Sequence, residues 1–536
     1  MKRPAGWRLT ALVLLLATAY FFVYHGNYLA DPLRFNDDVV QHYLWLYDTD
    51  WADDYYARTS GAVQPWGFYS LLWLLGHFLD PLPLSRYGPL LITWLTAWFT
   101  VGTLRRYFPL VLALAGTYLV LQYTLLTGQG FLARSFSTPL LAMFAYFLLG
   151  RSVKGVATTL ILSALFYPPV LLINGLILIL WEAGRWVVRY PAQRWQASLP
   201  EYLVLAAGGV TALVLAALQS YFIHRNPDLG EFFTAQELAA MTEFRGSGRV
   251  PFSNLTNTPY WWMGRYFTRL YFGTFPAPDI GLFITAVAAL LGLFNYRKLG
   301  ALASYLLLFI IATLALYEVA RLTTPLLFLA DRYLVYPWRF GVPLVIVFCF
   351  GAVWSLFRRR WLAYVLALGC SVIAYFYYLP SQVPYMDMTV YAELYDYLSE
   401  LPEDAMIAAP PEVANFIPLV SRRSVVLSHE AAHGLYFRHY YDYVTPRFRD
   451  YTTAITAPAD SLDRLTGFMD KYAVDFLVID PAMLSSHHHR SFSPYNETFR
   501  ARTQVQNNRE YAALNLADSV GVKVGSFVVV SRQEMK

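Results

Sequence analysis

Long apolar segments separated by short polar stretches occupy roughly the first 380 residues. A membrane-spanning helix needs about 20 consecutive apolar residues. Segments of spanning or near-spanning length cover residues 9–25, 66–79, 87–104, 108–126, 132–150, 156–182, 200–222, 278–296, 300–321, 333–356 and 361–379. Basic residues gather at one end of these segments, for example at Arg105 and Arg106 and at 358–360, which marks the cytoplasmic ends. The pattern predicts a polytopic α-helical membrane protein with about 10–13 membrane helices.

Two of these segments do not fit a single crossing. Residues 66–79 are too short to cross comfortably, and we predict that this stretch dips into the membrane and returns. Residues 156–182 carry "FYPP" at Phe166–Pro169. Paired prolines break a helix, so we predict a hairpin with its apex at this motif.

The pattern changes after Leu379, where hydropathy falls and the alternation typical of soluble domains begins. Four short segments are expected to be strands: 405–410, 424–428, 475–480 and 525–531. Residues 388–401 and 461–472 have the spacing of amphipathic helices. The sequence therefore predicts a membrane domain over 1–380 and an α/β domain over 381–536.

Composition agrees with this division. The chain is 57% hydrophobic and 14% charged, whereas soluble domains have about 25% charged residues. The net charge of +5 is small and comes from the topology signals, which argues against a nucleic-acid partner. The basic, apolar N-terminus is interpreted as an uncleaved first span running from cytoplasm to exterior. Loops 26–65 and 223–277 and the α/β domain then lie outside the cell membrane.

The first outer loop carries the motif "NDDVVQH". If this stretch is helical, Asp38 and His42 share a face and Asp37 pairs with Gln41. Adjacent aspartates point in different directions, so we predict two roles. Asp37 is the candidate general base, and Asp38 would orient a neighbour or contact a metal. The alternative is a solvated acidic loop.

Polar residues interrupt apolar sequence at three further places on the outer side. They lie in "LLTGQGFLARSF", "MTEFRGSGRVPF" and "LADRYLVYPWRF". Arginine at membrane depth usually has a partner such as a lipid phosphate or a carboxylate; a snorkelling anchor or plain loop charge is the alternative. The candidate substrate-binding residues are His42 from the first motif and Gln129, Arg134, Arg245, Arg249, Arg332, Tyr333 and Arg339 from these three.

The α/β domain contributes "HEAAH" at residues 429–433. A zinc-protease signature of this form needs a confident helix and a third ligand downstream, but here the motif directly follows a predicted strand. We favour a loop that faces the membrane site and adds His429 and His433 to the substrate-binding candidates.

The order of these motifs resembles the GT-C superfamily of integral-membrane glycosyltransferases. "NDDVVQH", "GQGFLARSF", "FYPP", "EFRGSGRVPF" and "DRY" are similar to a bacterial branch of that superfamily. The resemblance implies a multi-pass protein of the bacterial inner membrane that transfers a sugar, with inversion, from a polyprenyl-phosphate-linked donor. The acceptor would be an envelope glycan, a lipid or a protein. It also implies a first-loop catalytic aspartate, Asp37 or Asp38. Independently of the resemblance, the two carboxylates make Mg²⁺ or Mn²⁺ the candidate cofactor.

Two other functions fit parts of the pattern. A non-catalytic transporter or scaffold for lipid-linked polysaccharide would be expected to keep polar residues in the middle of its spans. A polysaccharide polymerase or ligase of another membrane fold would also use outer-loop arginines. The spans are mostly apolar and the polar motifs gather at one side, which favours the transferase.

Overall fold

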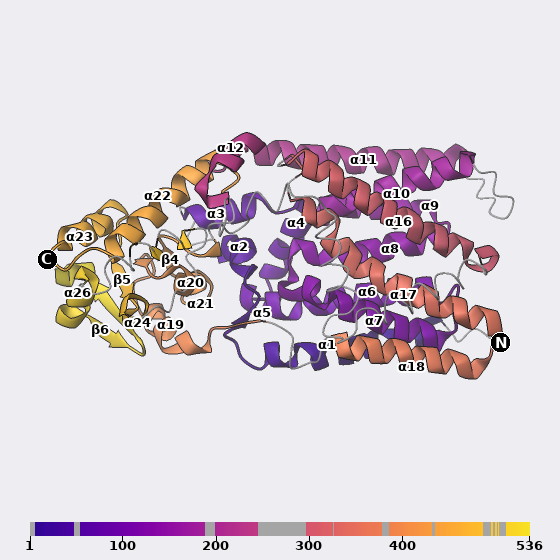
Figure 1. Ribbon diagram of the computed structural model, residues 1–536, viewed down its shortest axis with the longest axis horizontal. Helices are drawn as coiled ribbons and strands as arrows, with labels where there is room; N and C mark the ends of the chain where they lie inside the picture. The colour runs from indigo at the N-terminus through magenta and orange to yellow at the C-terminus, as the bar shows by residue number, and fades with distance from the viewer. Residues whose placement is uncertain are drawn as a thin grey trace.

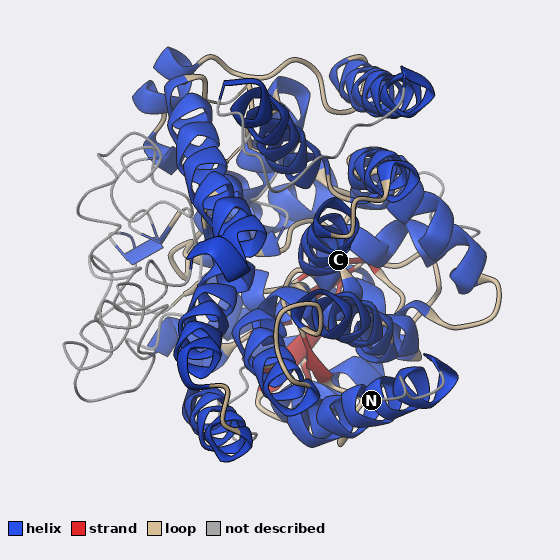
Figure 2. Cartoon of the chain, turned by 90° about the vertical axis from the view of Figure 1, so that its right-hand side faces the viewer, coloured by secondary structure: helices blue, strands red, loops and turns tan. Residues whose placement is uncertain are grey.

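The structure is a computed structural model in which a helical bundle and a smaller α/β domain lie end to end (Figure 1). It describes residues 6–47, 54–187, 199–244, 296–324, 326–327, 329–377, 385–430, 435–485, 495–496, 499–500, 502 and 511–535. Viewed along the long axis, many of the bundle helices are seen end-on, so they run roughly parallel to that axis (Figure 2).

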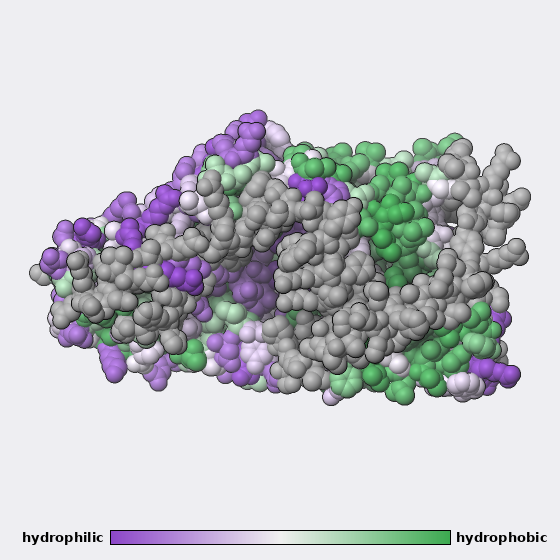
Figure 3. Space-filling view, viewed as in Figure 1, coloured by the Kyte–Doolittle hydropathy of each residue, from purple (hydrophilic) through white to green (hydrophobic). Residues whose placement is uncertain are grey.

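The bundle supplies the predicted membrane helices. Its main helices are α1 (Gly6–Leu29), α4 (Trp66–Gly76), α5 (Pro81–Tyr87), α6 (Pro89–Leu104), α7 (Leu110–Gly128), α8 (Ser137–Leu149), α9 (Val153–Phe166), α10 (Pro168–Val187), α11 (Leu199–His224), α16 (Tyr296–Leu322), α17 (Val335–Phe357) and α18 (Arg360–Tyr377). Six helices of the described chain are long and apolar enough to cross a membrane. On the face shown in Figure 3, apolar residues gather along the upper and lower parts of the bundle, whereas hydrophilic residues are more frequent on the α/β domain. The chain is a multi-pass membrane protein; the predicted span at 278–296 falls almost wholly outside the described residues.

The predicted hairpin is confirmed, whereas the dip of residues 66–79 into the membrane remains a prediction. Helix α4 has 11 residues, about 16 Å at 1.5 Å per residue, which is too short for a crossing. Its start packs on Leu165 and its end lies beside Leu46, so both ends stay at the end of the bundle that faces the α/β domain. In the second segment Asn174 Nδ2 donates to Ser163 Oγ at 3.3 Å. This contact requires α10 to fold back on α9, which confirms the hairpin.

The α/β domain is built on a five-stranded sheet in the order β4-β3-β5-β7-β6. Strands β3 (Met406–Ala408), β4 (Ser424–Val425) and β5 (Phe476–Ile479) are parallel, while β7 (Phe527–Ser531) is antiparallel to both β5 and β6 (Val522–Val524). All four predicted strands are present. The predicted helices correspond to α19 (Ala392–Ser399) and α23 (Leu462–Lys471). Helices α22 (Arg438–Ile455) and α26 (Ala512–Val520) and strand β6 are additional to those predictions.

The loop after α1 joins the two parts of the molecule. Strand β1 (Arg34–Phe35) pairs with β2 (Met386–Asp387). Helix α3 (Tyr55–Ala62) packs on α22, where the rings of Tyr55 and Tyr443 stack with centroids 3.7 Å apart. Because this loop also carries α2 (Val39–Tyr43), the "NDD" motif lies at the junction between the bundle and the α/β domain.

Candidate active site

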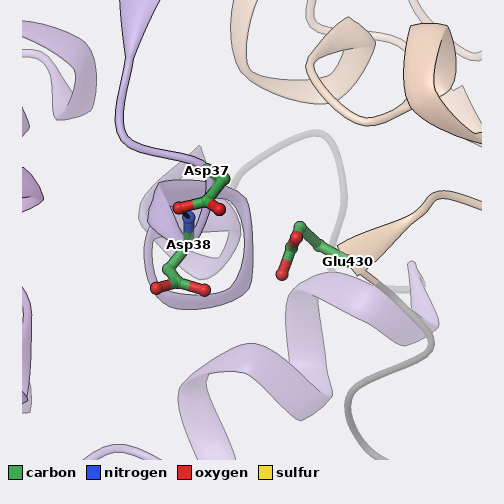
Figure 4. Close-up of side chains that lie close together, drawn as sticks. All are labelled: Asp37, Asp38 and Glu430. Carbon is green, nitrogen blue, oxygen red and sulfur yellow. Dashed lines mark hydrogen bonds between the residues drawn. The ribbon is translucent and has the colours of Figure 1, made fainter. Parts of the chain in front are cut away.

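Three carboxylates from distant parts of the chain meet at this junction. Asp37 and Asp38 lie between β1 and α2, and Glu430 follows β4 in the α/β domain (Figure 4). One ligand oxygen of each residue lies within 4.8 Å of those of the other two. Asp37 is exposed, Asp38 is partly buried and Glu430 is buried. The cluster therefore has one open carboxylate and two that are held by protein.

The parallel strands explain how Glu430 reaches this position. In open α/β sheets, functional groups gather beyond the carboxyl ends of parallel strands, and Glu430 lies five residues beyond the end of β4. Its backbone N–H donates to Asn415 Oδ1 at 3.0 Å, and its carboxylate accepts from Gln41 Nε2. These contacts fix the buried Glu430 carboxylate toward the first loop.

Asp38 forms an ion pair with Arg134, which lies after the "GQG" turn. Each side chain retains 17% exposure, so the pair is only partly screened by water. Asn36 Oδ1 accepts from Asp38 N at 3.3 Å and from Arg134 Nη2 at 3.4 Å. The "GQG" turn that precedes Arg134 contains Gly130, whose backbone is left-handed with φ +76°. A side chain there would crowd Asn36, so glycine permits the close approach.

Besides Arg134, two further arginines, Arg332 and Arg339, lie around Tyr336 and form a cationic group. Arg332 Nη1 donates to the Tyr336 hydroxyl, and the guanidinium carbons of Arg332 and Arg339 lie 5.1 and 5.8 Å from the centre of the Tyr336 ring. Arg339 Nη1 also donates to Thr127 Oγ1 at 3.1 Å. Arg332 interacts electrostatically with Asp38 and Arg134. The cationic group is therefore near enough to the Asp38–Arg134 ion pair to act on it electrostatically.

The surroundings shift the pKa of two groups in opposite directions. Asp37 is exposed on one side, but neighbouring protein atoms displace much of its water, and this desolvation raises the pKa of its carboxyl. The charges of Asp38 and Glu430 raise the pKa further, and Arg134 opposes them. Burial lowers the pKa of His42 to about 4, so its imidazole is neutral at pH 7.

In the "NDDVVQH" motif the predicted pairing of Asp37 with Gln41 is wrong. Gln41 donates to Asp38 at 3.5 Å and to Glu430, rather than pairing with Asp37. His42 Nδ1 contacts the side-chain amide of Gln64 within 3.0 Å, and the charge of Asp38 also acts on the imidazole. Asp38 is the N-cap of the 5-residue helix α2 and has helical backbone angles, φ −74° and ψ −6°, so Asp38 and His42 have the predicted i,i+4 spacing on one short helix.

The other predicted site residues fall into three groups. His429 lies beside the carboxylates, with Nε2 4.0 Å from Glu430 Oε1. Gln129 and Tyr333 are buried, at 4% and 3% exposure, and remain predictions as substrate contacts. Arg245, Arg249 and His433 lie outside the described residues.

Sequence reasoning did not assign Glu430, Asn36 or Tyr336 to the site. Glu430 stands within "HEAAH" and Asn36 within "NDD", two motifs whose histidines and aspartates are the predicted site residues. Tyr336 follows Arg332 by four residues, a spacing that places both on one helix face. That spacing was the available signal for Tyr336.

The three carboxylates are the candidate ligands for a cation. Hard divalent ions such as Mg²⁺ and Mn²⁺ prefer carboxylate oxygens, and these side chains carry three formal negative charges against the single positive charge of Arg134. Their spacing suits a shared ion. Glu430 of the "HEAAH" motif lies beside two aspartates. These carboxylate ligands differ from the histidine-rich ligand set of a zinc protease.

No family model and no curated protein sequence matches the chain. The chain is similar in structure to the Archaeoglobus fulgidus oligosaccharyltransferase tethered with an acceptor peptide, with 12% identity, a TM-score of 0.46, and coverage of 89% of this chain and 70% of that one. It is also similar to apo ArnT from Cupriavidus metallidurans, with 15% identity, a TM-score of 0.44 and 98% coverage of both chains. The described helices and sheet themselves confirm the predicted fold class, a polytopic helical bundle followed by an α/β domain.

Proposed function

We propose that this chain is a GT-C-type membrane glycosyltransferase that moves a sugar from a polyprenyl-phosphate-linked donor to an acceptor outside the cytoplasm, with inversion. The observation that carries the proposal is the junction itself. There an exposed carboxylate with a raised pKa, Asp37, stands next to two fixed carboxylates and a group of arginines. Such a site can hold a base and an anionic leaving group side by side.

Asp37 is the proposed general base. Its carboxylate would take the proton of the attacking acceptor hydroxyl while the hydroxyl oxygen forms a bond to the anomeric carbon. The bond from that carbon to the donor phosphate breaks, and the phosphate leaves with the electron pair. Attack from the face opposite the phosphate inverts the anomeric configuration. Asp38 is the weaker candidate for the base, because its carboxylate is engaged by Arg134.

The arginines would stabilise the leaving group. Charge develops on the phosphate as the glycosidic bond breaks, and fixed cations at that point lower the barrier. Arg332 and Arg339 flank Tyr336, and Arg134 links this group to the carboxylates through Asp38. A guanidinium matches phosphate oxygens in geometry as well as charge.

The α/β domain would complete the site through Glu430. If Mg²⁺ or Mn²⁺ binds, Asp37, Asp38 and Glu430 would hold it, and the ion would supply further positive charge for the donor phosphate. Without an ion, Glu430 raises the pKa of Asp37 and anchors Gln41. In both cases transfer would require the α/β domain to remain docked on the first loop.

The alternative is a non-catalytic transporter or scaffold for lipid-linked polysaccharide. One observation favours it: Gln122 is fully buried within α7, and polar residues inside spans often line transport pathways. The gathering of charged groups at the junction favours the transferase. Purified full-length protein in proteoliposomes, supplied with radiolabelled polyprenyl-phosphate sugar and candidate acceptors, separates the two. Transfer of label supports the proposal, whereas movement of the labelled lipid between leaflets without transfer would overturn it.

The pH dependence of transfer should move when Glu430 is neutralised. Burial, Asp38 and Glu430 all raise the pKa of Asp37, and a base must be ionised to act. The rate therefore falls as pH drops through that pKa. In Glu430→Gln one repulsive charge is removed, the pKa of Asp37 falls, and the acid limb of the kcat/KM profile should shift to lower pH.

The matched control for this shift is Glu400→Gln, because Glu400 is exposed in the same domain. Its profile should coincide with that of the wild type. An acid limb that stays in place or moves to higher pH in Glu430→Gln would contradict the assignment of Asp37 as the base.

A further inference from the structure

The hydroxyl of Tyr167 is buried without a hydrogen-bond partner among the described residues. Tyr167 is 8% exposed. The Nε of Arg332 is likewise buried without a hydrogen bond in the described part of the chain. Buried donors are nearly always satisfied in native proteins. Among the described residues, Arg332 Nε has only Asp331 Oδ1 nearby, at 3.9 Å, which is beyond hydrogen-bond distance. Both donors therefore have room for an acceptor at hydrogen-bond distance.

The "FYPP" motif places Tyr167 at this point. A proline disfavours the helical conformation in the residue before it, and Tyr167 has φ −156° and ψ 87° between α9 and α10. Its backbone N–H still closes α9 by donating to Ser163 O at 3.0 Å. The double proline thus breaks the helix at Tyr167 and directs this side chain away from the regular path of α9.

Tyr167 faces the cationic group. Its ring lies edge-on to that of Tyr336, with centroids 6.3 Å apart and an angle of 72°. The charges acting on Tyr167 come from Arg332, Asp331 and Arg134. The Tyr336 hydroxyl accepts from Arg332, so its own proton is available to another acceptor. Two phenol O–H groups and a guanidinium N–H therefore converge on one region.

We infer that Tyr167 is a substrate-binding residue whose hydroxyl donates to a phosphate oxygen of the lipid-linked donor, together with Tyr336 and Arg332. This inference rests on the proposed function, because it assumes a phosphate at the arginines. A tetrahedral phosphate offers several oxygens in different directions. This matches donors that come from helix α17, from the short helical turn before it and from the break between α9 and α10. Neutral phenols add hydrogen bonds without adding charge to a site that already holds Arg134, Arg332 and Arg339.

The test is binding of a short-chain polyprenyl phosphate to the full-length protein in lipid nanodiscs, followed by native mass spectrometry. Tyr167→Phe should weaken this binding about tenfold, because it removes one hydrogen bond to a charged acceptor. The matched control is Tyr305→Phe. Tyr305 is also buried, and its hydroxyl has no hydrogen-bond partner in the described chain. It lies in α16, roughly 25 Å along the helix axis from the end of α16 at Leu322, which is the end near Arg332.

Further arms identify the ligand and exclude a purely structural role. Unphosphorylated polyprenol and inorganic phosphate, each tested alone, distinguish the lipid tail and free phosphate from the lipid-bound phosphate.

The Tm of ligand-free Tyr167→Phe should match or exceed that of the wild type, because an unsatisfied donor is removed. A purely structural role of the Tyr167 hydroxyl would lower the Tm of the variant. Equal binding of polyprenyl phosphate by wild type and Tyr167→Phe would overturn the inference while the proposed function stands. Absence of binding to the wild type would overturn both.

Discussion

Asp37→Asn is expected to lower the rate of sugar transfer by about 10²–10⁴-fold, the usual contribution of a general base. Asparagine has nearly the same shape but cannot take the proton of the acceptor hydroxyl. Because Asp37 is exposed and is not a partner in the Asp38–Arg134 ion pair, the fold and donor binding should remain close to wild type. Initial rates with lipid-linked sugar at saturating donor, measured on purified protein in nanodiscs, provide the measurement.

Two companion variants sharpen this result. Asp396→Asn changes an exposed aspartate of the α/β domain and should leave the rate unchanged. Asp38→Asn should reduce transfer less than Asp37→Asn, because Asp38 is assigned to holding Arg134. Wild-type activity in Asp37→Asn, Asp38→Asn and the double variant would exclude a catalytic role for both aspartates.

Much of the membrane architecture follows from local chemistry and was therefore predictable. The length of an apolar run determines whether its helix can cross the membrane. The paired prolines Pro168 and Pro169 prevent a helix from continuing through them. Both effects act within one segment, so the α9–α10 hairpin could be derived without knowing its neighbours. The same holds for β5, whose apolar run "FLVI" is bounded by polar residues.

The site was predictable only in part because its contacts are tertiary. An arginine at membrane depth is expected to have a phosphate or carboxylate partner, and the ion pair of Arg134 with Asp38 meets this expectation. The contribution of Glu430 depends on how β4 lies in the sheet and how the α/β domain docks, and neither is encoded near residue 430. The partners of Gln41 and His42 likewise depend on Glu430 and Gln64.

Removing Arg134 from its ion pair with Asp38 is expected to lower the free energy of unfolding. Arg134→Met keeps most of the side-chain volume but leaves Asp38 in a partly buried position without its counter-charge. Loss of one partner from a buried pair usually costs about 3–5 kcal/mol. The 17% exposure of each side chain allows some screening, so we expect about 2–4 kcal/mol. Chemical denaturation of the purified protein in detergent gives this difference, with exposed Arg359→Met as the control.

The double variant Arg134→Met/Asp38→Asn separates stability from function. Neutralising Asp38 removes the unpaired charge, so the double variant should regain much of the stability lost in Arg134→Met. Transfer should stay low, because the cation that links the carboxylates to the arginines at the phosphate is still missing. Recovery of both properties would mean that Arg134 serves only to neutralise Asp38. Recovery of neither would mean that the pair contributes to the fold through contacts other than its charges.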